Sequence, residues 1–170
     1  MSLNTKTRRH EGTRRSLQIE VVNSSGRRAG CKARLRRQAK KVAGALGCSA
    51  GRWCIVLVND AEMSAMHARM MDDPTTTDVL TFDMREDAAG TLDLDTMVCV
   101  DEAARRAKEM GHSVADEVLL YAVHSLLHVC GYDDVTPAKA ARMHRREDEI
   151  LVELGIGARY APPAAKGEKR

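Results

Sequence analysis

One segment organises this chain: residues 113–134 read SVADEVLLYAVHSLLHVCGYDD. Ser113 is a suitable helix N-cap, and Gly131 is expected to end the helix because glycine readily adopts the left-handed conformation that follows a last helical turn. Apolar residues between these two positions recur at helical spacing and form one broad face. They are Val118, Leu119, Ala122, Val123, Leu126 and Val129. The pattern predicts a helix that packs in the core of the domain.

Two histidines lie on the border of that apolar face. His124 and His128 are four residues apart, so on a helix both imidazoles can reach a single metal ion. Past the predicted turn, Asp133 and Asp134 supply carboxylate oxygens for a third ligand. Three protein ligands with an open fourth position are typical of a catalytic metal site. An isolated histidine pair at this spacing also occurs in cores and on surfaces without a metal, and that alternative stays open at this point.

The residue after the first histidine bears on the class of reaction. Zinc peptidases of the His-Glu-x-x-His type carry a general-base glutamate at this place, and here the residue is Ser125. Peptide hydrolysis is therefore disfavoured, although a zinc hydrolase of another substrate remains an alternative.

The same segment resembles a known family. It is similar to the signature His-(Gly/Ser)-x-Leu-His-x-x-Gly-Tyr-Asp-His of the YbeY family, single-domain metal-dependent endoribonucleases of ribosomal RNA maturation and ribosome quality control. Residues 77–82, TDVLTF, are similar to the family's Thr-Asp-Val-Leu-Ser-Phe strand. Asp95, followed by residues 97–99, MVC, resembles a further strand of the family in weakened form. The resemblance covers residues 52–156, and it implies a small mixed sheet packed on helices, with the metal helix bordering a cleft.

The resemblance also implies roles for individual residues. The family's third histidine ligand aligns with Asp134, so the implied ligand set for one zinc ion per chain is His124, His128 and Asp134. A carboxylate in place of an imidazole lowers the charge of the site by one and weakens its Lewis acidity. Asp133 is then expected to accept a hydrogen bond from a ligand imidazole or to accept a proton during catalysis.

A phosphate-binding arginine is harder to assign. The family's conserved arginine, six residues before the Thr-Asp-Val-Leu block, falls on Met71 in this chain. Arg69 and Arg85 lie near it in sequence and are the candidates to neutralise charge on phosphate. For each of them an ordinary surface arginine is the alternative, and arginines in such positions are more often of that kind.

The rest of the chain predicts one α+β domain. Its 170 residues are 44% hydrophobic, which suits a single core, and the five cysteines contain no CxxC pair that would indicate a zinc ribbon. Strands are predicted at 17–23, 53–58, 77–84 and 92–100, and helices at 31–46, 60–71, 101–110, 113–130 and 136–154. We expect a small mixed four-stranded sheet packed with about five helices over residues 16–158. Residues 1–15 are expected to be a disordered basic tail and 159–170 a mobile C-terminal tail.

Charge is distributed unevenly along the chain. Residues 1–41 hold thirteen Lys or Arg against Glu11 and Glu20, whereas the whole chain has a net charge of only +3. The helix predicted at 31–46 carries much of this charge, so it is expected to present a basic surface to RNA. Plain solvation of a basic helix face is the alternative.

Together these features predict a single-strand-type endoribonuclease that acts on ribosomal RNA and ribosomal subunits with a zinc-activated water. The expected location is the cytoplasm, because no apolar segment resembles a signal peptide or a membrane span. One alternative is a non-catalytic ribosome-associated factor with a structural metal, and the other is the zinc hydrolase named above. The sequence leaves the cleavage site and the oligomeric state open.

Overall fold

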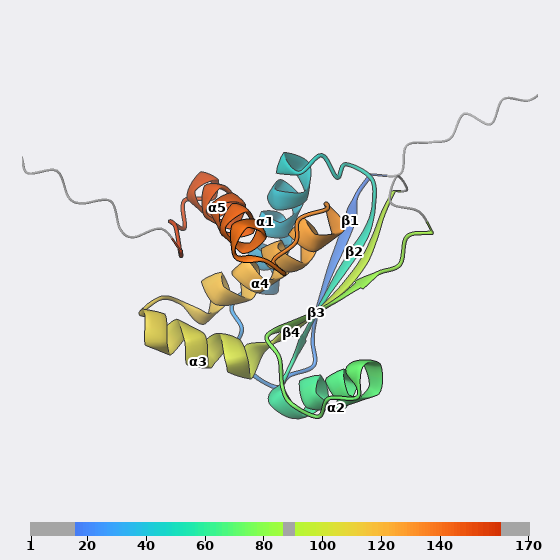
Figure 1. Cartoon of the computed structure of the whole chain (residues 1–170), viewed down its shortest axis with the longest axis vertical. Helices are drawn as coiled ribbons and strands as arrows, with labels where there is room; N and C mark the ends of the chain where they lie inside the picture. The colour runs from blue at the N-terminus through green and yellow to red at the C-terminus, as the bar shows by residue number, and fades with distance from the viewer. Residues whose placement is uncertain (1–15, 87–90, 161–170) are drawn as a thin grey trace, which may run out of the picture.

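A four-stranded mixed sheet forms one layer of the molecule and helices form the other (Figure 1). The computed structural model describes residues 16–86 and 91–160. Along the chain the elements are β1 (Gln18–Asn23), α1 (Lys32–Ala45), β2 (Gly51–Val58), α2 (Asp60–Met71), β3 (Val79–Asp83), β4 (Leu92–Cys99), α3 (Val100–Met110), α4 (Val114–Val129) and α5 (Pro137–Glu153). The predicted fold class, a single α+β domain with a mixed four-stranded sheet and five helices, is confirmed in this part of the chain.

The strands are arranged in the order β1-β2-β4-β3. β1, β2 and β4 are parallel, and β3 pairs antiparallel with β4 at the edge. Alternation along β2 and β4 sends Trp53, Ile55 and Leu94 to the helix side, where all three are fully buried. The opposite face carries Arg52, which pairs with Asp93 and Asp95 of β4. It also carries Val56, Leu80 and Met97, which are partly buried against a small separate apolar cluster.

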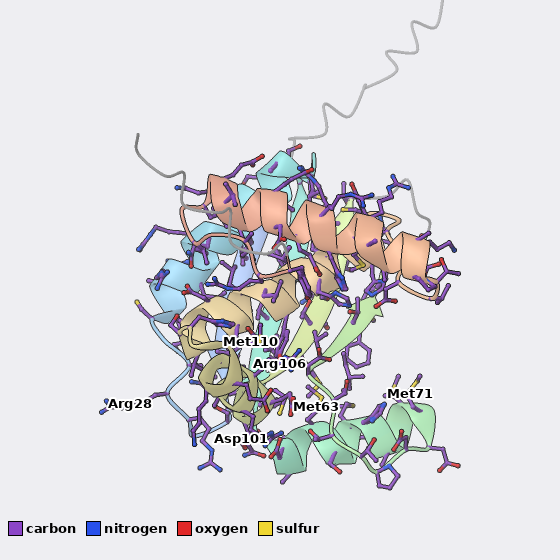
Figure 2. All side chains as sticks on the ribbon, turned by 60° about the vertical axis from the view of Figure 1, so that its left-hand side comes forward. Arg28, Met63, Met71, Asp101, Arg106 and Met110 are labelled. Atoms are coloured by element: carbon purple, nitrogen blue, oxygen red, sulfur yellow. The ribbon has the colours of Figure 1, made fainter. Side chains whose placement is uncertain are left out.

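Helix α4 lies between the sheet and α5, with α1 and α3 beside it (Figure 1). Most of its residues are buried, as the broad apolar face predicts. Helix α2 lies at the other end of the molecule, where Met63 is fully buried in a small separate cluster (Figure 2). The packing leaves the C-terminal end of α4 at the border of the core.

A chain of polar side chains fixes α4 on the sheet. The indole Nε1 of Trp53 donates to Thr96 Oγ1 at 2.9 Å, and that hydroxyl lies 2.8 Å from Ser125 Oγ. Thr81 of β3 also donates to Ser125 Oγ at 3.0 Å. Ser125, at the position of the peptidase glutamate, therefore faces the sheet and holds the helix between its two histidines.

The ends of the predicted domain differ from expectation in one respect. The predicted tail 1–15, and residues 161–170 of the predicted C-terminal tail, lie outside the described residues. Tyr160, however, is held on α5, since its backbone N–H donates to Asp148 at 3.1 Å and its ring stacks on His144 at 3.9 Å. Within the described ranges 16–86 and 91–160, no helix is long and apolar enough to cross a membrane.

Candidate metal centre

The end of α4 turns the chain sharply back along the helix. Gly131 has a φ of 88°, and its N–H donates to the carbonyl of His128 at 3.0 Å. The next N–H, that of Tyr132, donates to the carbonyl of Leu127 at 3.0 Å. This paired arrangement is a Schellman motif, which needs a left-handed residue at the glycine position. It returns the following residues, including Asp134, to the side of the helix that carries both histidines.

Each histidine is oriented through its Nδ1 nitrogen. His124 Nδ1 lies 2.7 Å from Glu147 Oε1, and His128 Nδ1 lies 3.2 Å from the carbonyl oxygen of Tyr132. Because a carbonyl only accepts and an ionised carboxylate only accepts, each Nδ1 is the donor and carries the proton in these bonds. The lone pair of each neutral imidazole is then on Nε2, and the two Nε2 atoms are 3.0 Å apart. Two facing lone pairs at this distance favour a cation between them.

Asp134 completes a group of three side chains that could hold a metal ion. Its Oδ2 lies 3.6 Å from His124 Nε2 and 3.9 Å from His128 Nε2. In a tetrahedral zinc site with bonds of about 2.0–2.1 Å, neighbouring ligand atoms are about 3.3 Å apart. The two imidazole nitrogens lie slightly closer together than this, and the carboxylate oxygen lies about 0.3–0.6 Å farther away, so a small movement of Asp134 would complete the site. The side chain of Asp134 is 40% exposed, which leaves this side of the group open to solvent. These three residues are the one such group of His, Cys, Asp and Glu found in the described part of the chain.

Glu147 is the supporting residue that sequence reasoning missed. It lies on α5, 23 residues from His124, and its side chain is fully buried. Burial is the largest single effect and lowers the pKa of His124, but the hydrogen bond and charge of Glu147, together with the charges of Asp78 and Asp134, outweigh it and raise the pKa. A signal was present, because Glu147 shares a helix face with Met143, Ile150 and Leu151, and a carboxylate at a core-facing position requires a partner.

Asp133 does not take the expected place beside an imidazole. Its carboxylate accepts from Lys139 Nζ at 2.6 Å and from the N–H of Val135 at 3.0 Å. These two bonds lower the pKa of Asp133 and tie it to the start of α5. The prediction that it accepts from a ligand imidazole is corrected, since Glu147 and the Tyr132 carbonyl occupy those two positions.

The two candidate arginines are placed differently. Arg85 donates to Asp83 at 2.6 Å and to the carbonyl of Val129 at 2.9 Å, so it joins the end of β3 to the last turn of α4. Arg69 is exposed near the end of α2. Met71, at the position of the family's arginine, is 67% exposed at the end of the same helix (Figure 2). Neither the bond of Arg85 to Asp83 nor its bond to Val129 reaches a candidate metal ligand.

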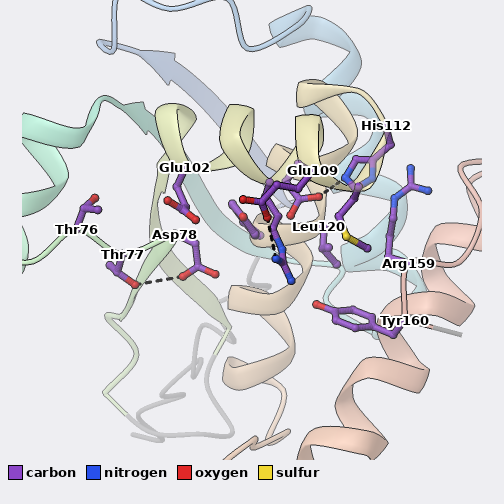
Figure 3. A pocket seen from close by; sticks show the side chains of 13 residues that line it. Thr76, Thr77, Asp78, Glu102, Glu109, His112, Leu120, Arg159 and Tyr160 are labelled. Atoms are coloured by element: carbon purple, nitrogen blue, oxygen red, sulfur yellow. Dashed lines mark hydrogen bonds and ion pairs between the residues drawn. The ribbon is translucent and has the colours of Figure 1, made fainter.

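A cavity of about 520 Å³ lies along the N-terminal half of α4 (Figure 3). Tyr121, one turn before His124, lines it together with Asp78 and Tyr160. His112 Nε2 is bonded there to the buried carboxylate of Glu117 (Figure 3). Asp78 also contributes to the raised pKa of His124, so the cavity and the metal ligands are electrostatically connected.

The basic segment predicted as a helix forms α1, and one of its arginines forms an ion pair with a neighbouring helix. Arg34 of α1 pairs with Asp116 of α4 at 3.1 Å. Arg37, Lys40 and Lys41 are exposed on the same helix.

Fold and site together define an α+β domain with a candidate mononuclear metal centre at the end of a buried helix. The model of one family, described as Endoribonuclease YbeY, matches residues 21–155. The chain therefore belongs to the YbeY endoribonuclease family.

Individual relatives agree with this assignment. The Endoribonuclease YbeY of Thermobifida fusca is 34% identical over 145 residues, covering 79% of this chain and 92% of that protein. The Anaeromyxobacter protein of the same name is 37% identical, covering 79% of this chain and 72% of its own length. A solution structure of a Thermotoga maritima protein has the same fold, with a TM-score of 0.57 at 21% identity, covering 81% of this chain and 92% of that one.

Proposed function

We propose that this chain is a metal-dependent, single-strand-type endoribonuclease that acts in ribosomal RNA maturation and ribosome quality control. The observation that carries the proposal is the convergence of His124, His128 and Asp134, with both Nε2 lone pairs directed into the group, in a member of an endoribonuclease family. Ribosomal RNA and ribosomal subunits are the proposed partners, and they place the reaction in the cytoplasm.

Zinc is the proposed metal, because two imidazole nitrogens and one carboxylate oxygen are ligands that zinc accepts in catalytic sites. When bound, it supplies Lewis acidity and lowers the pKa of a coordinated water toward neutrality. The chain's own residues prepare the site. Glu147 and the Tyr132 carbonyl hold the Nδ1 protons, which fixes the tautomer and the ring orientation of both imidazoles. Asp134 presents its carboxylate on the solvent side, where a phosphodiester approaches.

Cations next to the turn are suited to hold the phosphate backbone. Lys139 and Arg142 line a cavity of about 170 Å³ together with Asp133 and Tyr132. Arg142 lies over the Tyr132 ring at 5.1 Å, which fixes its direction. We propose that Arg142 bears the phosphate-neutralising role first expected of Arg69 and Arg85, with Lys139, which is paired with Asp133 at 2.6 Å, beside it.

The exposed residues of α1 are proposed as an additional RNA-facing surface. Phosphate contacts by Arg37, Lys40 and Lys41 make log K for RNA fall linearly with log salt concentration. Charge reversal of these three residues is expected to reduce the salt slope without changing metal content. An unchanged salt slope would show that the basic face of α1 is solvated and does not contact RNA.

The activity is tested by comparing wild type with His124→Ala on single-stranded and structured ribosomal RNA, with and without chelator. His67→Ala is the control, because this histidine lies on α2 and its Nδ1 contacts the carbonyl of Thr75. We expect cleavage by wild type and His67→Ala, and loss of cleavage on chelation or in His124→Ala. Equal RNA degradation by all three proteins contradicts the proposal. Casein serves as a peptide substrate, and cleavage of casein that depends on His124 supports the other zinc hydrolase.

A non-catalytic ribosome-associated factor is the second candidate. It is favoured by exposed Met71 at the position of the family's arginine and by the engagement of Arg85 with Asp83. Metal-dependent binding to ribosomal subunits without cleavage of any RNA supports this candidate.

A further inference from the structure

Two thiols from distant parts of the sequence meet at the end of α4. Cys48 follows α1 in the chain and Cys130 is the C-cap of α4, and their sulfur atoms are 3.9 Å apart. The backbone fixes both positions, since the N–H of Cys48 donates to Ala43 at 2.8 Å and that of Cys130 donates to Leu126 at 3.0 Å. A disulfide has a sulfur–sulfur distance of about 2.05 Å, so a movement of about 2 Å shared between two side chains joins them.

Cys48 is reachable from a cavity of about 240 Å³. Arg85 lines this cavity next to Cys48, and Leu92 at the start of β4 forms another part of its wall. Cys48 and Cys130 are both half-buried. The cavity therefore offers a small oxidant access to one thiol, with a guanidinium beside it and the second thiol in contact.

The surroundings of Cys48 favour its thiolate. The hydrogen bond from Cys130 is the largest effect and the charge of Arg85 adds to it, so that the pKa of Cys48 is lowered to about 7. Thiolates, rather than thiols, attack peroxides and disulfides. Cys48, which lines the cavity beside Arg85, is thus the attacking sulfur, and Cys130, which is not among the residues lining that cavity, is the resolving sulfur.

We propose that Cys48 and Cys130 form a redox modification site that a hydroperoxide converts into an intramolecular disulfide. The thiolate of Cys48 attacks the peroxide O–O bond and takes one oxygen, which gives a sulfenic acid and releases an alcohol, or water from hydrogen peroxide, once the leaving oxygen takes up a proton. Cys130 then attacks the sulfenic sulfur, the S–S bond forms, and the oxygen leaves as water with the thiol proton. In total two thiols lose two electrons, and one peroxide is reduced to two molecules of water or to water and an alcohol.

The disulfide is expected to act on the metal ligands through the helix end. Cys130 lies between His128 and Tyr132, whose carbonyl oxygen orients that histidine. Because the backbone of Cys130 is hydrogen-bonded into the helix end, pulling its side chain toward Cys48 strains the last turn of α4. We expect oxidation to weaken zinc binding by about tenfold, the lower end of the range for losing an orienting partner. The formation of the disulfide itself does not depend on the proposed nuclease activity.

The test treats the reduced full-length protein with a few equivalents of hydrogen peroxide and maps disulfides by mass spectrometry without reduction. We expect a Cys48–Cys130 peptide in wild type and in the control Cys54→Ser, whose half-buried thiol lies on the outer face of β2. In Cys130→Ser, oxidation is expected to stop at a sulfenic acid on Cys48 that dimedone traps. Zinc affinity is measured by competition with a chromophoric chelator before and after oxidation.

Three outcomes overturn the inference. Failure to form the Cys48–Cys130 peptide while other cysteines oxidise overturns the site. Trapping of a sulfenic acid on Cys54 rather than on Cys48 overturns the assignment of the attacking thiol. Quantitative disulfide formation with unchanged zinc affinity overturns the coupling to the metal centre.

Discussion

Two glutamate–histidine pairs lie along α4, and only one of them belongs to a metal-ligand group. Glu147 holds His124 through Nδ1, whereas Glu117 is bonded to Nε2 of His112. Both carboxylates are buried. The two pairs differ in which ring nitrogen the carboxylate binds. In His124 the carboxylate binds Nδ1, and Nε2 faces His128 and Asp134. In His112 the carboxylate binds Nε2 itself. In this molecule, therefore, the carboxylate on Nδ1 leaves Nε2 of His124 facing two further potential ligand atoms, whereas His112 belongs to no such group among the described residues.

The largest expected effect separates the two pairs directly. His124→Ala or His128→Ala removes a coordination bond and is expected to abolish stoichiometric zinc, since two remaining ligands hold the ion poorly. Asp134→Ala is expected to weaken binding more than Asp133→Ala. Elemental analysis and chelator competition measure both effects. Full zinc occupancy in His128→Ala contradicts the ligand assignment, and Asp134→His is expected to keep or strengthen binding.

Substituting the two glutamates in turn tests which of the two carboxylates affects zinc affinity. Glu147→Gln removes the charge that holds His124 and is expected to weaken zinc binding by about 10–100-fold. Glu117→Gln is the matched control and is expected to leave zinc affinity within about twofold, because its partner lies outside the ligand group. Equal losses in the two variants, measured by the same competition assay, show that helix packing rather than imidazole orientation controls affinity.

The pH dependence of binding gives a smaller and more specific effect. Zinc and a proton compete for Nε2 of His124. Glu147 raises the pKa of this imidazole, so it increases the affinity of His124 for a proton as well as for zinc. As the pH falls through that raised pKa, wild type loses affinity before Glu147→Gln does. The advantage of wild type is expected to be largest near about pH 8 and to shrink toward about pH 5.5. A pH-independent ratio contradicts this account.

The smallest expected effect on the metal comes from the second pair. His112→Ala leaves Glu117 buried without its partner and is expected to lower the free energy of unfolding by about 2–4 kcal/mol. Zinc stoichiometry of the folded protein stays at one per chain. Urea unfolding and elemental analysis of the same sample measure the two quantities. Loss of zinc from a folded His112→Ala protein would contradict the claim that the His112–Glu117 pair takes no part in metal binding.

Much of this molecule follows from local sequence patterns. Apolar periodicity and the cap residues Ser113 and Gly131 predict α4 correctly. Apolar runs and alternation predict the four strands, so the fold class could be predicted from the sequence. Helix α2 begins at Asp60, as predicted, and its N-cap is Asn59, whose side chain accepts from the backbone N–H of Glu62. The order of strands in the sheet did not follow from any local signal.

The supporting groups of the site required tertiary structure. Asp133 was favoured because it adjoins Asp134 in sequence, but Lys139 draws its carboxylate toward α5. Glu147 reaches His124 only because α5 packs across α4, and the Tyr132 carbonyl carries no side-chain signal at all. Spacing therefore predicted the two histidines, and the family resemblance predicted Asp134 as a third candidate ligand, whereas neither could predict the groups that orient the imidazoles.

The central claim, a metal held by two imidazoles and one carboxylate, is tested most directly by the zinc X-ray absorption spectrum of the loaded wild-type protein. The ligand set His124, His128 and Asp134 predicts only nitrogen and oxygen neighbours at about 2.0–2.1 Å, with the outer-shell scattering of two imidazole rings. A sulfur neighbour at about 2.3 Å would show that a thiol such as Cys130 binds the metal, and would contradict the account.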